Sequence, residues 1–278
     1  MNLTEEVYKI LTNSRIRKAW PSNPRAVKET IRFCLQSNQP IILVTNWLGV
    51  KTKNKGVADN VDKAVLLNLK RNIIDKLVEM KVKVLIKILF TDINASYLEG
   101  YKKEKMDLYW NSLKPMINSF GKNFQLIKCN SDLWNNLFKL NGNETFELDE
   151  IAKATGDLDI LEEVKRIASN VLKTDIFKKF VSQAEKHSLF VKNKVMTAEE
   201  LAKRYVYFRI FARRRYKKMF PHEIYFYYDK PKSQITEFVS YPTIYIFPVY
   251  KGFSDCPWFI DENHKRFKML VETEKIKL

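Results

Sequence analysis

The segment from Leu89 to Tyr101, LFTDINASYLEGY, carries the polar residues whose types and spacing best suit an active site. A hydrophobic run ends there, and a carboxylate, an amide, a phenol and a second carboxylate follow within a few positions. A carboxylate at the end of a strand can bind a substrate ammonium group or act as a general base. We therefore predict catalytic roles for four residues of this segment, Asp92, Asn94, Tyr97 and Glu99.

Each of these side chains also has an ordinary structural explanation. Asp92 can form an Asx turn or cap the next helix, and Asn94 can serve in a turn. Tyr97 and Tyr101 are of a type that commonly packs with its hydroxyl toward solvent. Glu99 can be a solvated surface charge. The segment is a candidate active site because the predicted strands and helices around it determine where its side chains lie.

Those elements predict a parallel β-sheet. Apolar runs at 41–46 and 82–91, rich in β-branched residues, are typical of buried strands. Between them, residues 59–80 carry apolar side chains at helical spacing, with Asp62 as an acidic residue of the first turn. A strand, a helix and a second strand form a βαβ unit, in which the two strands run parallel and the crossover is right-handed.

The flanking regions add helices and a third strand. Residues 1–38 are predicted to be helical, and so are residues 102–120. The run at 124–129 is predicted as a third parallel strand. Residues 131–195 are predicted as a helical insertion or cap within the domain, with breaks at Asn141-Gly-Asn143, Gly156 and Thr174.

The last third of the chain returns to the sheet. Thr197-Ala-Glu-Glu200 is a capping box that opens a helix ending near Met219. Strands are predicted at 223–228 and 243–249, and an antiparallel pairing is considered for these two. We predict one α/β domain over residues 1–278, with a Rossmann-like, mostly parallel sheet, flanking helices and an inserted helical subregion.

Three loops follow the predicted strands, at 45–53, 91–101 and 251–259. In open α/β sheets, ligands bind beyond the carboxyl ends of the strands, and functional side chains concentrate on loops held by a rigid scaffold. Each loop contains a glycine and mixes aromatic with polar residues. We predict substrate contacts by six residues of these loops, Asn46, Trp47, Lys51, Tyr101, Asp255 and Trp258.

Several common chemistries leave no trace in the sequence. The chain has seven glycines and contains no GxGxxG, GxxxxGK[ST] or GxSxG motif, which argues against a dinucleotide-binding fingerprint, a P-loop and a nucleophile elbow. The three cysteines form no CxxC pair and the three histidines are scattered, which argues against a disulfide framework or a zinc site. We predict no metal and no cofactor.

The charge of the chain favours a polyanionic partner. The 49 basic and 32 acidic residues give a net charge of +17, and nucleic acid is the first candidate partner. A genome-wide bias toward lysine is the alternative explanation. No apolar run approaches the roughly 20 residues of a membrane span, and the N-terminal segment lacks the apolar core of a signal peptide. We predict a cytoplasmic protein with no membrane association, and the oligomeric state is left open.

The helix at 197–219 is the most basic part of the chain. On a helical wheel, its core face is predicted to hold Leu201, Tyr205, Phe208, Ala212 and Met219. The opposite face is predicted to hold Arg213 and other basic residues, interleaved with aromatic and apolar residues. Arginine among aromatics is a common surface for binding phosphates and stacking bases, although cations in a last helical turn also suit the helix dipole. We predict contacts with tRNA or other RNA by Lys203, Arg209, Arg213, Arg214, Lys217 and Lys218.

The order of these features resembles the isocyanide synthases. The shared features are a first strand with a lysine-bearing loop, a helix that begins with aspartate, a second strand ending in aspartate, a basic helix, the segment MFPHEIYFYYDKP and a final PWF. The family's late strand ends in His-Pro and its final motif is PWH, where this chain has Tyr228-Asp-Lys-Pro231 and Pro257-Trp-Phe259. The resemblance implies conversion of an amino acid's amine to an isonitrile with a sugar phosphate, which Lys51 or Lys53 would engage.

The layout also resembles the tRNA-dependent cyclodipeptide synthases, including their divergent, arginine-using fungal-type group. The shared features are the size, a Rossmann-like sheet without a nucleotide fingerprint, and an arginine-rich helix. This resemblance implies that the basic helix holds an aminoacyl-tRNA, whose activated ester needs no ATP site. The family's nucleophilic serine follows the first strand, where this chain has Thr45, which joins the catalytic candidates.

Our leading prediction is an aminoacyl-tRNA-using enzyme that forms an amide or a cyclic dipeptide from an amino-acid-derived substrate. The first alternative is an isocyanide-synthase-like enzyme acting on a free amino acid. The second alternative is a non-catalytic RNA-binding protein. Dependence of product formation on RNA separates the first two, and retention of all activity after Asp92→Asn would favour the third.

Overall fold

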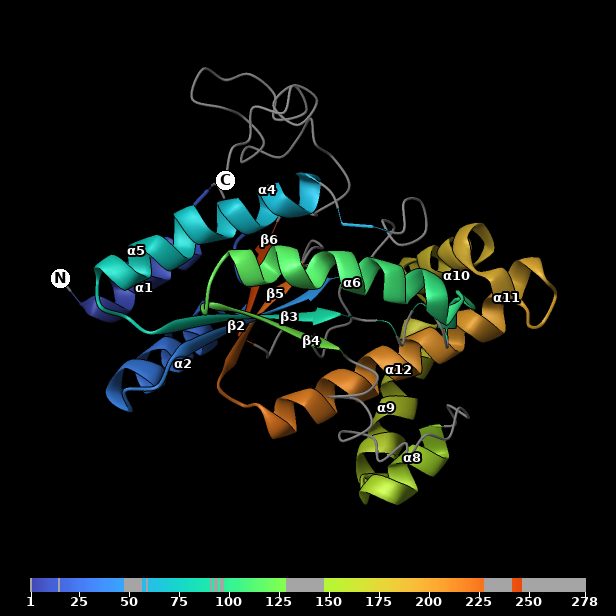
Figure 1. The fold of residues 1–278 in the computed structure, drawn as a ribbon. Coiled ribbons are helices and arrows are strands. Elements are labelled where there is room, and N and C mark those ends of the chain that lie inside the picture. Colours follow the sequence, from blue (N-terminus) through green and yellow to red (C-terminus); the bar gives the residue numbers. More distant parts are fainter. Residues whose placement is uncertain are drawn as a thin grey trace.

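A computed structural model gives the fold (Figure 1). It describes residues 2–14, 16–47, 57–58, 60–90, 92, 95, 98–128, 148–227 and 242–246. Helices cover both faces of a central β-sheet, which confirms the predicted α/β, Rossmann-like class. None of the helices in these ranges is long and apolar enough to cross a membrane.

The sheet has six strands in the order β1-β6-β5-β2-β3-β4. The strands are β1 (Arg17–Ala19), β2 (Ile41–Trp47), β3 (Val84–Phe90), β4 (Phe124–Lys128), β5 (Glu223–Tyr227) and β6 (Thr243–Ile246). The pairs from β6 through β4 are parallel, and β1 is antiparallel to β6. The predicted strand–helix–strand unit and the third parallel strand are therefore confirmed.

Two expectations about the sheet are wrong. The strands β5 and β6 run parallel, with Tyr225 opposite Thr243. A hairpin can be tight, whereas parallel strands need a longer crossover, and the segment between these strands is long enough for one. The region 1–38 forms α1 (Leu3–Leu11) and α2 (Pro24–Gln36), but the three residues of β1 form an edge strand between them. A strand of three residues is too short to show the alternation that sequence patterns detect.

One face of the sheet is covered by α1, α2, the long helix after β2, and α6 (Lys103–Ser119). The long helix comprises α4 (Asn60–Leu69), a π-helical turn at Lys70–Ile74 and α5 (Asp75–Glu79), close to the predicted range 59–80. Its apolar stripe, including Val65 and Ile73, packs on the inward residues of β2 and β3. Burial of this stripe is the main contribution to the stability of this layer.

The opposite face carries the later helices, α8 (Leu148–Thr155), α9 (Leu158–Val171), α10 (Asp175–His187), α11 (Leu189–Lys192) and α12 (Ala198–Met219). The helix α12 contacts both α9 and α10, and its side chains share one core with Val44 and Tyr225 of the sheet. The predicted capping box opens α12, because the Thr197 hydroxyl accepts from the Glu200 backbone N–H at 3.2 Å and the Glu200 carboxylate accepts from the Thr197 backbone N–H at 2.9 Å. Because α12 packs against several elements, it is buried on more than one side.

Candidate functional site

The carboxyl ends of three parallel strands lie side by side. Trp47 of β2 is opposite Phe90 of β3, and Thr45 is opposite Phe226 of β5. The segment after β3 therefore starts at the same edge as the segments after β2 and β5, as the general rule for open α/β sheets requires. The backbone carbonyl of Glu99 accepts a hydrogen bond at 2.8 Å from Leu189 N–H, which attaches this segment to α11.

Both predicted catalytic carboxylates lie at this edge. Asp92 is only 2% exposed, so its carboxylate lies inside the protein. Glu99 is partly buried, and its carboxylate accepts a hydrogen bond at 3.4 Å from the phenol of Tyr205 on α12. Glu99 is therefore not a solvated surface charge. A buried carboxylate near a substrate site can bind a cation or accept a proton.

The end of β2 is held in the core by a polar contact. Thr45 is fully buried, and the buried indole of Trp47 donates from Nε1 to Asp62 Oδ1 at 3.1 Å. The same carboxylate oxygen accepts from the Tyr109 hydroxyl on α6 at 2.8 Å. Asp62, predicted only as a first-turn acid of the helix, thus connects β2, α4 and α6. The contact gives Trp47 a structural role at the end of β2.

A row of polar side chains runs along α12 on its sheet-facing side. We call Tyr205, Arg209, Arg213 and Tyr216 the sheet-facing row. These residues contact the segment after β3, then the last residue of β5, and finally the first residue of β5. The prediction that Arg213 lies on the face opposite the core is wrong, because α12 is buried between the sheet and α9–α10 and its polar residues also face inward.

Arg209 is held among aromatic rings. Its guanidinium carbon lies 4.9 Å from the ring centre of Phe180 on α10 and 5.1 Å from that of Tyr205. One terminal nitrogen donates to the Tyr227 hydroxyl at 3.4 Å. Because Tyr227 is the last residue of β5, these contacts place the Arg209 charge at the carboxyl edge of the sheet.

Arg213, one helical turn further on, lies over two tyrosines of β5. Its guanidinium carbon is 4.2 Å from the ring centre of Tyr227 and 5.0 Å from that of Tyr225. A guanidinium over a ring face is attracted by the ring quadrupole. The alternation of Tyr225 and Tyr227 places both phenols on the α12 side, a signal that the sequence EIYFYY contained and that our sequence analysis missed.

At the C-terminal end of the sheet-facing row, the buried carboxylate of Glu223 lies at the start of β5. Glu223 accepts hydrogen bonds from the Tyr216 hydroxyl and from Lys87 of β3. The ammonium group of Lys87 also lies 5.0 Å from the ring centre of Phe220. This ion pair connects β3, β5 and α12 at a distance from the carboxyl edge, and we interpret it as structural.

Four other basic residues of α12 form ion pairs with acids of the chain. Arg214 donates to Glu163 of α9, with Nη2 to Oε1 at 3.0 Å, and both Arg215 and Lys218 pair with Asp157. Lys203 pairs with Glu199 of its own helix at 2.9 Å. The pairs with Glu163 and Asp157 attach α12 to α9 and its N-cap, so they contribute to the packing of the helical layer. RNA contacts by Lys203, Arg209, Arg213, Arg214, Lys217 and Lys218 stay a prediction.

The positions of the other predicted residues give less information about function. Asn46 is the partly buried neighbour of Trp47 on β2. The Tyr101 hydroxyl donates to the His187 carbonyl at 3.1 Å, and burial raises the pKa of this phenol. Asn94, Tyr97, Lys51, Asp255 and Trp258 lie outside the described residues, so their predicted roles stay predictions. No group of three or more His, Cys, Asp or Glu side chains within the described ranges is arranged to hold a metal ion.

Burial, followed by the nearby charge of Glu99, raises the pKa of Tyr205 well above its ordinary value near 10. The neutral phenol therefore contributes stability that is fully present below about pH 10, the pKa of the unfolded chain, and is lost as the pH rises toward the folded pKa. We expect Tyr205→Phe to make the fall of unfolding free energy above pH 10 less steep. Urea unfolding from pH 8 to 11 measures this slope, and an unchanged slope would contradict the assignment.

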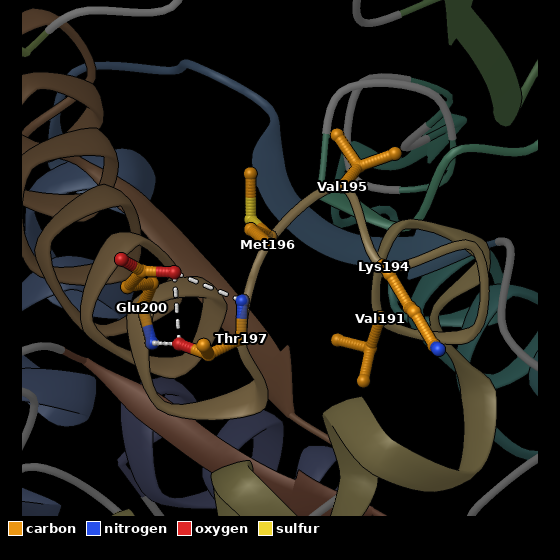
Figure 2. Close-up of a pocket in the computed structure, with 6 residues that line it drawn as sticks. All are labelled: Val191, Lys194, Val195, Met196, Thr197 and Glu200. Carbon is orange, nitrogen blue, oxygen red and sulfur yellow. Dashed lines mark hydrogen bonds between the residues drawn. The ribbon is translucent and has the colours of Figure 1, made fainter.

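A surface pocket of about 440 Å³ lies between α11 and the start of α12 (Figure 2). Its lining residues are Val191, Lys194, Val195, Met196, Thr197 and Glu200. The Glu200 carboxylate is turned to Thr197 in the capping box, as Figure 2 shows, and the other lining side chains are mostly apolar. The pocket therefore offers little chemistry, and the candidate site remains at the carboxyl edge.

The fold defines the class of protein as a Rossmann-like α/β protein with a layer of later helices on one face of its sheet. Among solved structures, the chain is similar to the PvcA protein from Pseudomonas aeruginosa, with a TM-score of 0.59 and 14% sequence identity. The similarity covers 89% of this chain and 84% of that chain. No protein-family model and no curated protein matches the chain. At this identity the comparison establishes the fold.

Proposed function

We propose that the chain is an enzyme that acts on the amine of a free amino acid, on an isocyanide-synthase-like scaffold. The observation that carries the proposal is the similarity of fold to PvcA over most of both chains. PvcA is related to the isocyanide synthases, so this similarity favours that family over the cyclodipeptide synthases. The order of sequence features resembles the same family, which supports the proposal independently.

The carboxyl-edge residues suit such a substrate. Asp92 is buried at the end of β3 and Glu99 lies against Tyr205, so two carboxylates are near the place where an α-ammonium group would bind. Desolvation strengthens the attraction between a carboxylate and an ammonium group. In this proposal, Asp92 binds the ammonium group and accepts a proton from it, which makes the nitrogen nucleophilic.

The use of aminoacyl-tRNA has weaker support. Arg214, Arg215 and Lys218 form ion pairs with acids of α9 or its N-cap, and Arg213 lies over rings of the sheet. An interface with nucleic acid relies on cations that can replace counterions along the phosphates. Cations that already pair with acids of the protein attract phosphates less strongly. We therefore propose a free amino acid, rather than aminoacyl-tRNA, as the substrate.

Turnover assays separate these possibilities. The purified protein is incubated with ¹⁵N-labelled amino acids and a panel of sugar phosphates, and products are identified by mass spectrometry. Parallel reactions contain RNase, or charged tRNA in place of the free amino acids. We expect ¹⁵N-labelled product that forms in the presence of RNase. Product that requires charged tRNA would replace this proposal with the aminoacyl-tRNA alternative, and no turnover under any condition would contradict both.

The variant Asp92→Asn tests the proposed role within the same assay. Removing a general base costs about 10²–10⁴-fold in rate, so we expect turnover to fall by at least about 100-fold. The matched control is Asp175→Asn on α10, whose carboxylate is exposed, and it should retain the full rate. Thermal unfolding of both variants checks that they are folded. Full activity of Asp92→Asn would remove Asp92 from the mechanism.

A further inference from the structure

Two arginines of the sheet-facing row have the placement expected of an anion-binding subsite. Arg209 and Arg213 are one helical turn apart, a spacing that brings side chains of one helix face to about 5–6 Å between Cβ atoms. Both guanidinium groups are directed toward Tyr227, which ends β5. Two positive charges are therefore gathered at the edge where open α/β sheets bind ligands.

Aromatic rings hold both arginines near the end of β5. The guanidinium carbon of Arg209 lies over Phe180 and Tyr205, and that of Arg213 lies over Tyr225 and Tyr227. A guanidinium presents a planar fork of donors that matches a carboxylate or a phosphate. Ordering of this kind lowers the entropy lost when an anion binds.

The charges in this group of contacts favour binding of an anion. The group contains two guanidinium groups and one carboxylate, that of Glu99. The ring of Tyr205 contacts Arg209, and its hydroxyl donates to Glu99. The arginines thus lie toward β5, and the carboxylates Asp92 and Glu99 lie in the segment after β3. Such a separation suits a ligand that carries an ammonium group at one end and an oxyanion at the other.

We propose that Arg209 and Arg213 form an oxyanion-binding subsite at the carboxyl edge of the sheet, built on Tyr225 and Tyr227. This inference deepens the proposed function and rests on it for the source of the ligand. The oxyanion is either the carboxylate of the amino acid or the phosphate of a sugar phosphate. In both cases the guanidinium edges donate to two oxygens of the ligand.

The test measures anion binding without turnover. Thermal unfolding of the full chain is followed while inorganic phosphate or acetate is added, with sodium chloride adjusted to constant ionic strength. A ligand that binds the folded chain raises the midpoint in a saturable way. We expect saturation in the wild type, and we expect Arg209→Gln with Arg213→Gln to require at least about tenfold more anion. The matched control, Arg25→Gln, removes the same type of charge from an exposed position on α2 and should respond like the wild type.

The two probes distinguish the sources of the ligand. Saturation at a lower concentration of acetate supports a carboxylate subsite, and saturation at a lower concentration of phosphate supports a phosphate subsite. Equal responses of the wild type and the double variant to both anions would overturn the proposal. So would a double variant that changes only the binding of tRNA in a gel-shift assay, because the arginines would then serve an RNA interface.

Two further measurements test the proposal if the double variant does not fold. Arg213→Lys keeps the positive charge but loses the planar fork, so it should bind the better anion several-fold more weakly. In the wild type with isotope-labelled arginine, phosphate or acetate should shift a small subset of side-chain NMR signals, and Arg213→Lys should remove one of them. An absence of shifts would overturn the proposal. Because none of these readouts needs a substrate, failure of the turnover assay and failure of this subsite can be told apart.

Discussion

Asp157→Ala is expected to lower the free energy of unfolding by about 3–5 kcal/mol, the usual cost of leaving a buried charge without its ion-pair partner. Asp157 is 1% exposed, and it pairs with Arg215 at 2.7 Å and Lys218 at 3.0 Å. The side chain of Arg215 is only 15% exposed and would lose its carboxylate, whereas that of Lys218 is 60% exposed and can be hydrated. Most of the loss should therefore come from Arg215.

Urea unfolding followed by far-UV circular dichroism measures this effect. The control is Glu162→Ala on α9, which removes an exposed carboxylate that pairs across one helical turn with Lys165, and it should change stability by less than about 1 kcal/mol. Arg215→Met in the Asp157→Ala background should recover part of the loss, because it removes the unpaired charge. A loss below about 1 kcal/mol for Asp157→Ala would contradict the ion pair as described.

Asp62→Ala is expected to have a comparably large effect, a loss of about 2–6 kcal/mol. Asp62 is fully buried, and its Oδ1 accepts from the indole of Trp47 and the phenol of Tyr109. Each buried donor left without its acceptor costs about 1–3 kcal/mol. The substitution should also loosen the end of β2, because Trp47 would lose the contact that fixes its ring.

A double-mutant cycle with Tyr109→Phe tests this contact directly. The coupling between Asp62→Ala and Tyr109→Phe should lie between about 0.5 and 3 kcal/mol, as for residues in one hydrogen-bonded group. Asp75→Ala on α5 is the matched control, because its carboxylate is partly exposed and pairs with Lys70. Urea unfolding of the four proteins gives the cycle. A coupling near zero would show that Tyr109 and Asp62 contribute independently.

The elements of the fold were predictable because their signals are local. The β-branched run of β2 and the helical spacing after it gave the βαβ unit, and the capping box at Thr197 marked the start of α12. The parallel pairing of β5 with β6 was missed, because strand direction depends on the path of the connection. The edge strand β1 was missed, because its partner β6 lies at the other end of the chain.

The candidate site was predictable only in its location. The carboxyl-edge rule placed Asp92 and Glu99 correctly at the end of β3, since it requires only the order of the strands. The helical wheel failed for Arg213, because a wheel assumes one buried face and α12 is packed on several sides. The contacts of Asp62 with Trp47 and Tyr109 join three elements, and no spacing in the sequence indicates such a meeting.

The position of β5 in the sheet has a consequence for how the protein is made. The strand β2 lies between β3 and β5, and its pairing with β5 begins at Ile42 opposite Glu223. During synthesis, β2 and β3 can pair early, but the other edge of β2 stays open until the helical layer and α12 have been made. That edge, Ile41–Trp47, is mostly apolar and lies in the middle of the finished sheet. An open apolar strand edge favours pairing between chains, so slow synthesis of the helical layer should promote aggregation of the nascent protein.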